Sequence, residues 1–156
     1  MRVILQRVKE SSVVVDGEVV GAVDSGMLLL VAAEKGDGPR EVEAVAEKLA
    51  VLRIFEDEAG KMNLDIGQAG GGFLVVSQFT LAGSLRKGRR PSFDGAAPPA
   101  EAEPLVEMLA ERLAAKGFPV AGGRFGAHME VRLLNDGPVT FVLDVRDGKV
   151  VDPQRG

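Results

Sequence analysis

Residues 133–141 read LLNDGPVTF and join two apolar, strand-like segments at the dipeptide Gly137-Pro138. Proline fixes its own φ angle and has no N–H, whereas glycine adopts backbone angles that other residues avoid. An X–Pro bond is also the peptide bond that most readily becomes cis. Two interpretations follow from these residues alone: a rigid corner that exposes its carbonyl groups, or an ordinary loop between two strands.

The composition indicates a single domain without disulfide bonds. The chain has 156 residues, no cysteine and a formal net charge of −4. This length can bury one hydrophobic core, so we expect one domain over residues 1–156, in which residues 146–156 form a C-terminal extension with a hairpin. No apolar run reaches the ~18 residues of a membrane span, and the first residues lack the pattern of a secretory signal. We therefore expect a cytoplasmic protein with no membrane partner.

The single histidine, His128, limits the chemistry that the chain can perform. A Ser-His-Asp site or a histidine-based metal site would have to be built around this one residue. We therefore expect no zinc and no cofactor, while a carboxylate-bound magnesium ion stays open. The acidic balance argues against nonspecific binding of nucleic acid, and we expect no DNA partner, but a local basic patch is compatible with it.

Hydrophobic periodicity predicts more strands than helices. The predicted strands are residues 2–8, 11–15, 18–20, 27–33, 73–76, 129–134 and 139–145. Asp16-Gly17 and Asp147-Gly148 predict hairpins. We predict a layered α+β fold, in which mostly antiparallel sheets form a barrel-like core and two main helices pack outside.

The two predicted helices have clear start and stop signals. One begins after Gly38 with Pro39 at its first position, and the other carries Glu101 early and ends at Gly117. Pro104 means that the second helix either starts there or has a kinked first turn. The glycine-rich residues 67–72 lack the Lys-Ser/Thr of a phosphate loop and are predicted as a turn.

Two polar segments are candidate site residues. Ser77, Gln78, Phe79 and Thr80 follow a buried strand, where hydroxyl, amide and backbone N–H groups can be held rigidly; the alternative is that they only close hydrogen bonds at a sheet edge. The cations Arg86, Lys87, Arg89 and Arg90 fall within five residues. Such a concentration in an acidic chain indicates a phosphate-rich partner, or else a solvated loop.

Several of these segments together resemble the D-aminoacyl-tRNA deacylase family. The matching motifs are Gln6–Val8, Gly60–Leu64, Ser77–Leu81, Arg89–Phe93 and Asn135–Thr140, in family order and spacing between about Met1 and Val145. The resemblance implies a homodimer that hydrolyses the ester between a D-amino acid and the terminal adenosine of tRNA. It also implies that catalytic residues Ser77–Thr80 meet Gly137 and Pro138 of the other subunit, joined by a cis bond and oriented by Arg7.

The reaction implied by this resemblance fits the residues that are present. An aminoacyl ester is activated, so its hydrolysis needs oxyanion stabilisation and a positioned water more than a strong nucleophile. Backbone N–H groups near Gln78 and Phe79 can stabilise the oxyanion, while Ser77 and Thr80 shape the pocket without being acylated. Backbone atoms of Gly137 and Pro138, pressed against the α-carbon, would exclude every L-side chain and tolerate glycine. The basic loop 86–90 would contact the tRNA phosphates.

Two other functions compete with this interpretation. A serine esterase could use Ser77 and His128 on small esters, although the chain has no Gly-x-Ser-x-Gly elbow. A noncatalytic RNA-binding module is the second alternative. It is weakened by the absence of tyrosine and tryptophan and by only 7 phenylalanines for base stacking.

Overall fold

Strand β1 (Arg2–Val15) is the centre of the molecule, and the computed structural model describes residues 1–153 around it. β1 pairs antiparallel with three strands at once, because its length lets different parts of it face different neighbours. These neighbours are β2 (Glu18–Val23), β3 (Gly26–Ala32) and β8 (Glu130–Arg146). Beyond β3 the sheet continues in parallel with β6 (Gly72–Ser77) and β7 (Val120–Gly122), and β9 (Lys149–Val151) pairs antiparallel with the end of β8.

The sheet is open, which corrects the predicted barrel-like core. Its strand order is β7-β6-β3-β1-β8-β9, and β2 pairs with β1 outside this path. The sheet curls enough to bring β2 and β7 together, since a Cβ on Gly21 would lie 1.9 Å from the carbonyl oxygen of Gly122. Within residues 1–153, however, no hydrogen-bonded pairing joins these two strands. Alternation along a strand predicts which face is buried, not whether the two edges of a sheet will pair.

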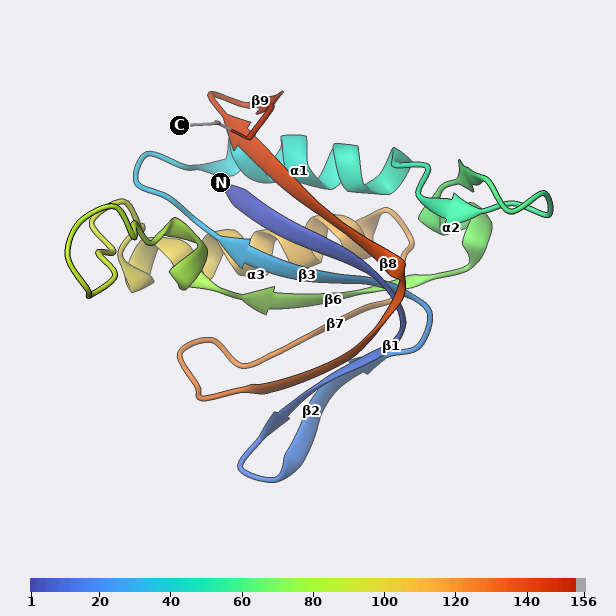
Figure 1. Cartoon of the computed structure of the whole chain (residues 1–156), viewed down its shortest axis with the longest axis horizontal. Coiled ribbons are helices and arrows are strands. Elements are labelled where there is room, and N and C mark those ends of the chain that lie inside the picture. Colours follow the sequence, from blue (N-terminus) through green and yellow to red (C-terminus); the bar gives the residue numbers. More distant parts are fainter. Residues whose placement is uncertain (154–156) are drawn as a thin grey trace.

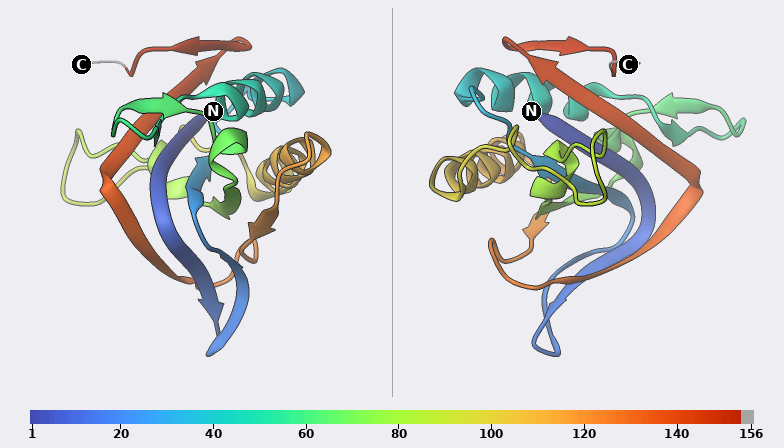
Figure 2. Two further views of the ribbon diagram at one scale, coloured as in Figure 1. Left: turned by 90° about the vertical axis from the view of Figure 1, so that its right-hand side faces the viewer. Right: turned by 60° about the vertical axis from the view of Figure 1, so that its left-hand side comes forward.

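Both predicted main helices pack on one side of the sheet, as Figure 2 shows. They are α1 (Pro39–Val51), with Gly38 as its N-cap, and α3 (Pro99–Ala115). Because α3 begins at Pro99, Pro104 lies inside the helix rather than at its start. The ion pair between Glu43 and Arg112 joins the two helices.

The sheet buries both of its faces, because successive side chains of a strand point to opposite sides. In β6, Phe73 and Val75 belong to the larger core under the helices, whereas Leu74 and Val76 belong to a second core. The curvature of β1 closes this second core, since Val13 packs there and Val3 packs under the helices. This double burial explains the continuous apolar sequences of β3 and β6.

The remaining elements are short. A small hairpin is formed by β4 (Phe55–Glu56) and β5 (Met62–Leu64), and the helices α2 (Ile66–Ala69) and η1 (Phe79–Ala82) flank β6. The helix α2 occupies part of the segment predicted as a turn. It is stabilised by reciprocal hydrogen bonds between Asp65 and Gln68, at 2.8 and 2.9 Å, and this spacing is a recognised capping signal.

Two long strands replace four predicted ones. β1 joins the predicted strands 2–8 and 11–15, and β8 joins 129–134 and 139–145 through Gly137 and Pro138. Both predicted hairpins are confirmed, with positive φ angles at Asp16 and Asp147. Figure 1 shows β8 crossing the molecule and changing direction sharply near its middle.

The described residues contain no helix that is both long enough and apolar enough to span a membrane.

Candidate active site

A cavity of about 590 Å³ opens at the end of β6. Its walls come from four separate segments of sequence: the end of β3, β6 with η1, the stretch from Phe93 into α3, and the stretch from Phe125 into β8. The residues that line it are Val31, Ala33, Val76, Ser77, Gln78, Phe79, Phe93, Ala96, Ala97, Pro98, Pro99, Ala102, Val106, Phe125, Gly126, Ala127, His128, Met129 and Val131. A mostly apolar cavity with a few polar groups is typical of a binding site for a small molecule or for one end of a larger substrate.

Three of the four predicted catalytic residues line this cavity. Ser77, Gln78 and Phe79 contribute to its wall, whereas Thr80 is not among the lining residues. Thr80 is linked to the site through Gln78, whose side-chain amide donates a hydrogen bond to the Thr80 hydroxyl. The structure therefore places three of these residues at one cavity and Thr80 just beyond its lining.

The backbone N–H groups of this motif differ in availability. The N–H of Gln78 donates to the carbonyl of Val31 at 2.7 Å, so the predicted use of that group for an oxyanion is corrected. The N–H groups of Phe79 and Thr80 open the helix η1 and have no acceptor among the described residues. First-turn N–H groups lack partners within their own helix. Phe79 and Thr80 therefore supply the two N–H groups of the motif that are able to bind a developing negative charge.

His128 lies at the same cavity but is not assembled into a catalytic triad. It lines the wall together with Ser77. In the part of the chain that the structure describes, no hydrogen bond joins His128 to the Ser77 hydroxyl, and no ion pair joins it to a carboxylate. Residues 1–153 also contain no cluster of three or more His, Cys, Asp or Glu side chains that could hold a metal ion.

The predicted basic loop is attached directly to the cavity wall. Its base is closed by two backbone hydrogen bonds between Ser84 and Ser92, at 2.7 and 2.9 Å. The next residue, Phe93, packs edge-on against Phe79 with ring centroids 5.1 Å apart. Two lining residues, Phe93 and Phe125, are not among the predicted site residues. Phe93 nevertheless belongs to the matched motif 89–93.

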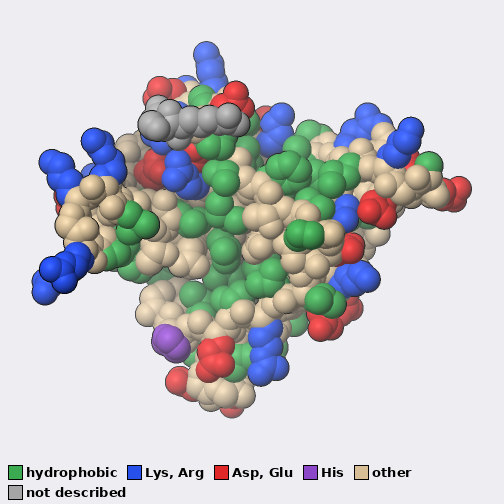
Figure 3. All heavy atoms as spheres, in the orientation of Figure 1, with side chains coloured by type: hydrophobic (Ala, Val, Ile, Leu, Met, Phe, Trp, Pro, Cys, Tyr) green, Lys and Arg blue, Asp and Glu red, His purple; other side chains and the backbone are tan. Residues whose placement is uncertain are grey.

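All four predicted cations of this loop are exposed. Arg86, Lys87, Arg89 and Arg90 make no ion pair with any carboxylate in residues 1–153. Figure 3 shows basic side chains gathered at the left edge of the molecule, where Figure 1 places this loop. The loop therefore presents unneutralised positive charge beside the cavity.

The segment around Gly137 and Pro138 is a bulge in β8. Between the paired residues Asn135 and Thr140, β8 has four residues, 136–139, where β1 has only Arg7. We call residues 136–139 the corner. The Gly137–Pro138 bond is cis, as the resemblance implied, and both residues are exposed while Val139 is buried.

Arg7 lies beneath the corner and contacts its first residue. Its guanidinium is buried and donates from Nε to the Asp136 carbonyl at 2.8 Å and from Nη1 to the Ile54 carbonyl at 2.6 Å. The carboxylates of Glu56 and Asp136 lie 3.7 and 3.6 Å from it. Hydrogen bonds from a charged donor are among the stronger ones in proteins, so Arg7 fixes the corner against the base of the β4–β5 hairpin.

The corner and the cavity lie apart within the chain. β1 and β3 separate β8 from β6, and no residue between 132 and 142 lines the cavity. Figure 1 shows the same separation, with the bend of β8 on the right and the end of β6 on the left. The structure therefore does not bring the two predicted segments together within one chain.

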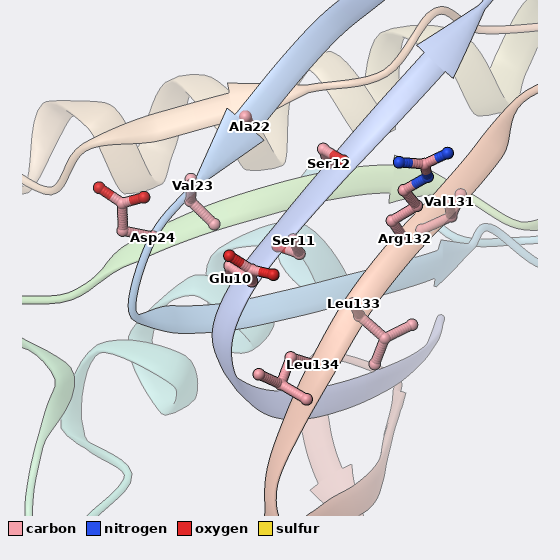
Figure 4. Close-up of a pocket in the computed structure, with 10 residues that line it drawn as sticks. All are labelled: Glu10, Ser11, Ser12, Ala22, Val23, Asp24, Val131, Arg132, Leu133 and Leu134. Carbon is pink, nitrogen blue, oxygen red and sulfur yellow. The ribbon is translucent and has the colours of Figure 1, made fainter.

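A second hollow, of about 690 Å³, lies on the surface formed by β1, β2 and β8. Figure 4 shows its lining: the charged side chains Glu10, Asp24 and Arg132, with Ser11, Ser12, Ala22, Val23, Val131, Leu133 and Leu134. None of the predicted site residues is among them. This hollow is therefore distinct from the cavity at the end of β6.

Comparisons with known proteins match the part of the chain that contains these motifs. Residues 4–144 match the model of a family described as D-Tyr-tRNA(Tyr) deacylase. A D-aminoacyl-tRNA deacylase from Thermomicrobium roseum is 60% identical over 144 residues, which are 92% of this chain and 94% of that protein. Another protein of that name, from Geobacter metallireducens, is 57% identical over 144 residues, covering 92% of this chain and 95% of the relative.

Two solved structures share the fold. One is described as c-Myc DNA Unwinding Element Binding Protein and has a TM-score of 0.87 at 37% identity, covering 94% of this chain and 99% of that one. The other is described as a probable eukaryotic D-amino acid tRNA deacylase; it has a TM-score of 0.76 at 20% identity and covers 92% and 98% of the two chains. The cavity motif and the corner both fall inside the matched region, and β9 falls outside the family match.

Proposed function

This chain belongs to the D-Tyr-tRNA(Tyr) deacylase family, and we propose how its cavity and corner make ester hydrolysis selective for D-amino acids. The family and its relatives identify the chain as a D-aminoacyl-tRNA deacylase, a hydrolase of the ester bond between a D-amino acid and tRNA. The proposal concerns which groups act, and how the L-ester is rejected. Because charged tRNA is its substrate, we place the enzyme in the cytoplasm.

The cavity provides what an activated ester requires. Water adds to the ester carbonyl, the carbonyl oxygen becomes negative, and the ribose oxygen leaves with a proton. The N–H groups of Phe79 and Thr80 stabilise the negative oxygen, because preorganised donors do so at little reorganisation cost. The neighbouring ribose hydroxyl of the substrate assists proton transfer, since the cavity wall holds no assembled base.

Ser77, Gln78 and Thr80 shape this site without forming a covalent intermediate. The Ser77 hydroxyl has no base hydrogen-bonded to it among the described residues, and activation by an adjacent base is what turns a serine into a nucleophile. Gln78 connects strand β3 to η1, because its backbone N–H donates to Val31 and its side chain donates to Thr80. These contacts hold the two free N–H groups in place.

Chiral selection is supplied by the corner of a second copy of the chain. The observation that carries this proposal is that Gly137 and Pro138 are exposed and lie away from the cavity of their own chain. In a two-fold symmetric dimer every contact between the chains occurs twice. If the corner of one chain enters the cavity of the other, the second corner therefore enters the first cavity. Backbone atoms placed close to the α-carbon then exclude an L-side chain by steric overlap, whatever D-side chain is bound.

The surface around the corner also fits a homodimer. Leu134 is 51% exposed, Phe141 is 45% exposed, and Leu133 and Val142 are also exposed along the same strand. Large apolar side chains gathered on one surface are typical of a protein interface. We propose that a second copy covers this strand and part of the hollow shown in Figure 4.

The basic loop binds the tRNA part of the substrate. Its four cations are unpaired in residues 1–153 and lie beside the cavity, so they can contact phosphates while the aminoacyl end enters. Phosphate contacts are insensitive to sequence and weaken as salt increases. This predicts that tRNAs of different sequence are accepted.

The proposal is tested by comparing esters of a single tRNA. Purified enzyme is incubated with D-aminoacyl-, L-aminoacyl- and glycyl-tRNA, and released amino acid is measured. We expect rapid hydrolysis of the D-ester, little of the L-ester and intermediate hydrolysis of the glycyl ester, because glycine has no side chain to exclude. Similar rates for D- and L-esters would contradict steric selection.

Two controls separate the alternative functions. A serine esterase would hydrolyse a small ester such as p-nitrophenyl acetate through Ser77, with loss of that activity in Ser77→Ala. A noncatalytic RNA-binding module would bind all three tRNAs and release no amino acid.

A further inference from the structure

The side chain of Asn135 closes the base of the corner. Its Oδ1 accepts a hydrogen bond from the Val139 N–H at 2.7 Å, and its Nδ2 donates to the Val139 carbonyl at 3.3 Å and to the Thr140 hydroxyl at 3.0 Å. Both backbone groups of Val139 are therefore paired with one side chain. Asparagine commonly replaces a backbone partner in this way.

The two ends of the corner are held by different residues. Arg7 binds the carbonyl of Asp136 at the first end, and Asn135 binds Val139 at the last. Gly137 and Pro138 lie between these fixed points and make no side-chain hydrogen bond in the described residues. Their direction therefore depends on both anchors.

Asn135 is itself connected to the central strand. The Thr140 hydroxyl that accepts from Asn135 also accepts from the side chain of Gln6 at 3.2 Å. Gln6 and Thr140 are paired residues of β1 and β8. Two side chains, Arg7 and Asn135, thus hold the corner in a fixed position relative to the strand beneath it.

We propose that Asn135 is a positioning residue for chiral selection, acting through the backbone of Gly137 and Pro138. This inference rests on the proposed function, in which those two residues exclude L-side chains. Steric exclusion requires backbone atoms to stay within a fraction of an ångström of one position, because a small retreat makes room for a side chain. Without Asn135 the corner keeps its anchor at Asp136 but loses the one at Val139.

Asparagine is well suited to this position because its amide carries an acceptor and a donor in one plane. Asn135→Ala removes all three hydrogen bonds. Asn135→Asp keeps an acceptor for the Val139 N–H but places a second acceptor against the Val139 carbonyl. The two variants therefore remove different parts of the same contact.

The test measures hydrolysis of D- and L-aminoacyl-tRNA by wild type, Asn135→Ala and Asn135→Asp. We expect Asn135→Ala to lower the ratio of D to L rates by about tenfold or more, mainly through faster hydrolysis of the L-ester, since three hydrogen bonds are lost. Asn135→Asp should recover part of the ratio. If Asn135→Ala does not fold, Asn135→Asp must still show a ratio below that of wild type.

The matched control is Gln68→Ala, which also removes a side-chain amide that bonds nearby backbone, at helix α2. It should leave the D to L ratio unchanged. A wild-type ratio in Asn135→Ala, or an equal loss of both rates, would overturn the inference about Asn135 while leaving the proposed function intact. Equal D and L rates in the wild type would instead overturn the proposed function.

Discussion

The backbone conformation at position 137 and the atoms around it require glycine. Its φ angle is +150°, and a Cβ there would lie 2.6 Å from a methyl carbon of Val139 and 2.8 Å from the Val139 nitrogen. L-residues rarely adopt this angle, and the buried Val139 has little room to move. The sequence showed a glycine before a proline; the structure shows that the glycine is needed because the corner folds back on Val139.

His128 provides a prediction that separates two mechanisms. It lines the cavity but has no hydrogen bond to Ser77 or ion pair with a carboxylate in the described part of the chain. We therefore expect His128→Ala to hydrolyse D-aminoacyl-tRNA with kcat within about threefold of wild type, because no step uses a histidine base; a base normally contributes about 100-fold or more. A loss of 100-fold or more in kcat, with unchanged KM, would favour the serine esterase mechanism.

Asp57 provides a prediction about pH at the small hairpin. Its carboxylate accepts hydrogen bonds from the N–H groups of Lys61 and Ala59, at 3.0 and 2.9 Å. These bonds, that from Lys61 first, hold the pKa of Asp57 below its ordinary value of 3.8. A carboxyl group whose folded pKa is lowered stabilises the fold above its unfolded pKa, and this contribution is lost as pH falls through the folded pKa.

We therefore expect the protection of amides in residues 55–64, taken relative to the intrinsic exchange rate at each pH, to fall on acidification below about pH 4 in the wild type. In Asp57→Ala the exchange should be faster at neutral pH and should lack this acid dependence. The measurement is residue-resolved hydrogen exchange together with titration of the Asp57 carboxyl by NMR. Titration at or above the ordinary pKa would contradict the assignment.

Individual elements could largely be predicted from the sequence. The hairpin at Asp16-Gly17 and the start of α1 follow from local signals that do not depend on distant residues. The continuity of β1 and β8 could not be predicted, because their polar middle residues read as interruptions. β1 instead continues through Glu10, which pairs with Leu134, and β8 continues past residues 136–139, which bulge opposite Arg7. The helix α2 was missed although its capping pair, Asp65 and Gln68, was present in the sequence.

The sequence motif named several residues that line the cavity, but it did not show which other side chains complete the cavity wall. Ser77, Gln78 and Phe79 were predicted and line the cavity, while Phe93 and Phe125 were found only in the structure. Their contacts are long-range and carry no periodic signal. The pairing of the Gln78 N–H with Val31 likewise depends on the neighbouring strand, so the free N–H groups could not be identified from the sequence.

The basic loop is an element whose role is measurable separately from catalysis. We expect the triple variant Arg86→Ala, Lys87→Ala and Arg89→Ala to raise KM for D-aminoacyl-tRNA by about tenfold or more while kcat changes little, because phosphate contacts are lost. The dependence of KM on salt should become shallower. Lys149→Ala, which removes an exposed cation of β9, is the matched control. An unchanged salt dependence in the triple variant would remove the loop from the tRNA interface.

At the scale of the whole molecule, the open sheet supports the proposal that a second copy of the chain covers β8. A strand order that ends at β7 and β9 leaves β8 with exposed apolar side chains and an exposed corner. The same order places the cavity at the end of β6, beyond β3 and β1. The open sheet therefore separates the two motifs within one chain, and the proposed dimer is what would bring them together.

The central claim is that each active site combines the cavity of one chain with the corner of another. Two variants test it: Ser77→Trp, whose ring fills its own cavity, and Pro138→Arg, whose long side chain blocks the cavity that the corner enters. Each variant alone should be inactive. In a heterodimer, the unblocked cavity of the Pro138→Arg chain meets the unaltered corner of the Ser77→Trp chain.

The most direct measurement is therefore hydrolysis of D-aminoacyl-tRNA by an equal mixture of the two variants after subunit exchange, with gel filtration to confirm dimers. The account predicts that activity returns to about a quarter of the wild-type value, since random pairing makes half of the dimers mixed and each mixed dimer has one working site. An inactive mixture in which mixed dimers have formed, or full activity of Pro138→Arg alone, would contradict it.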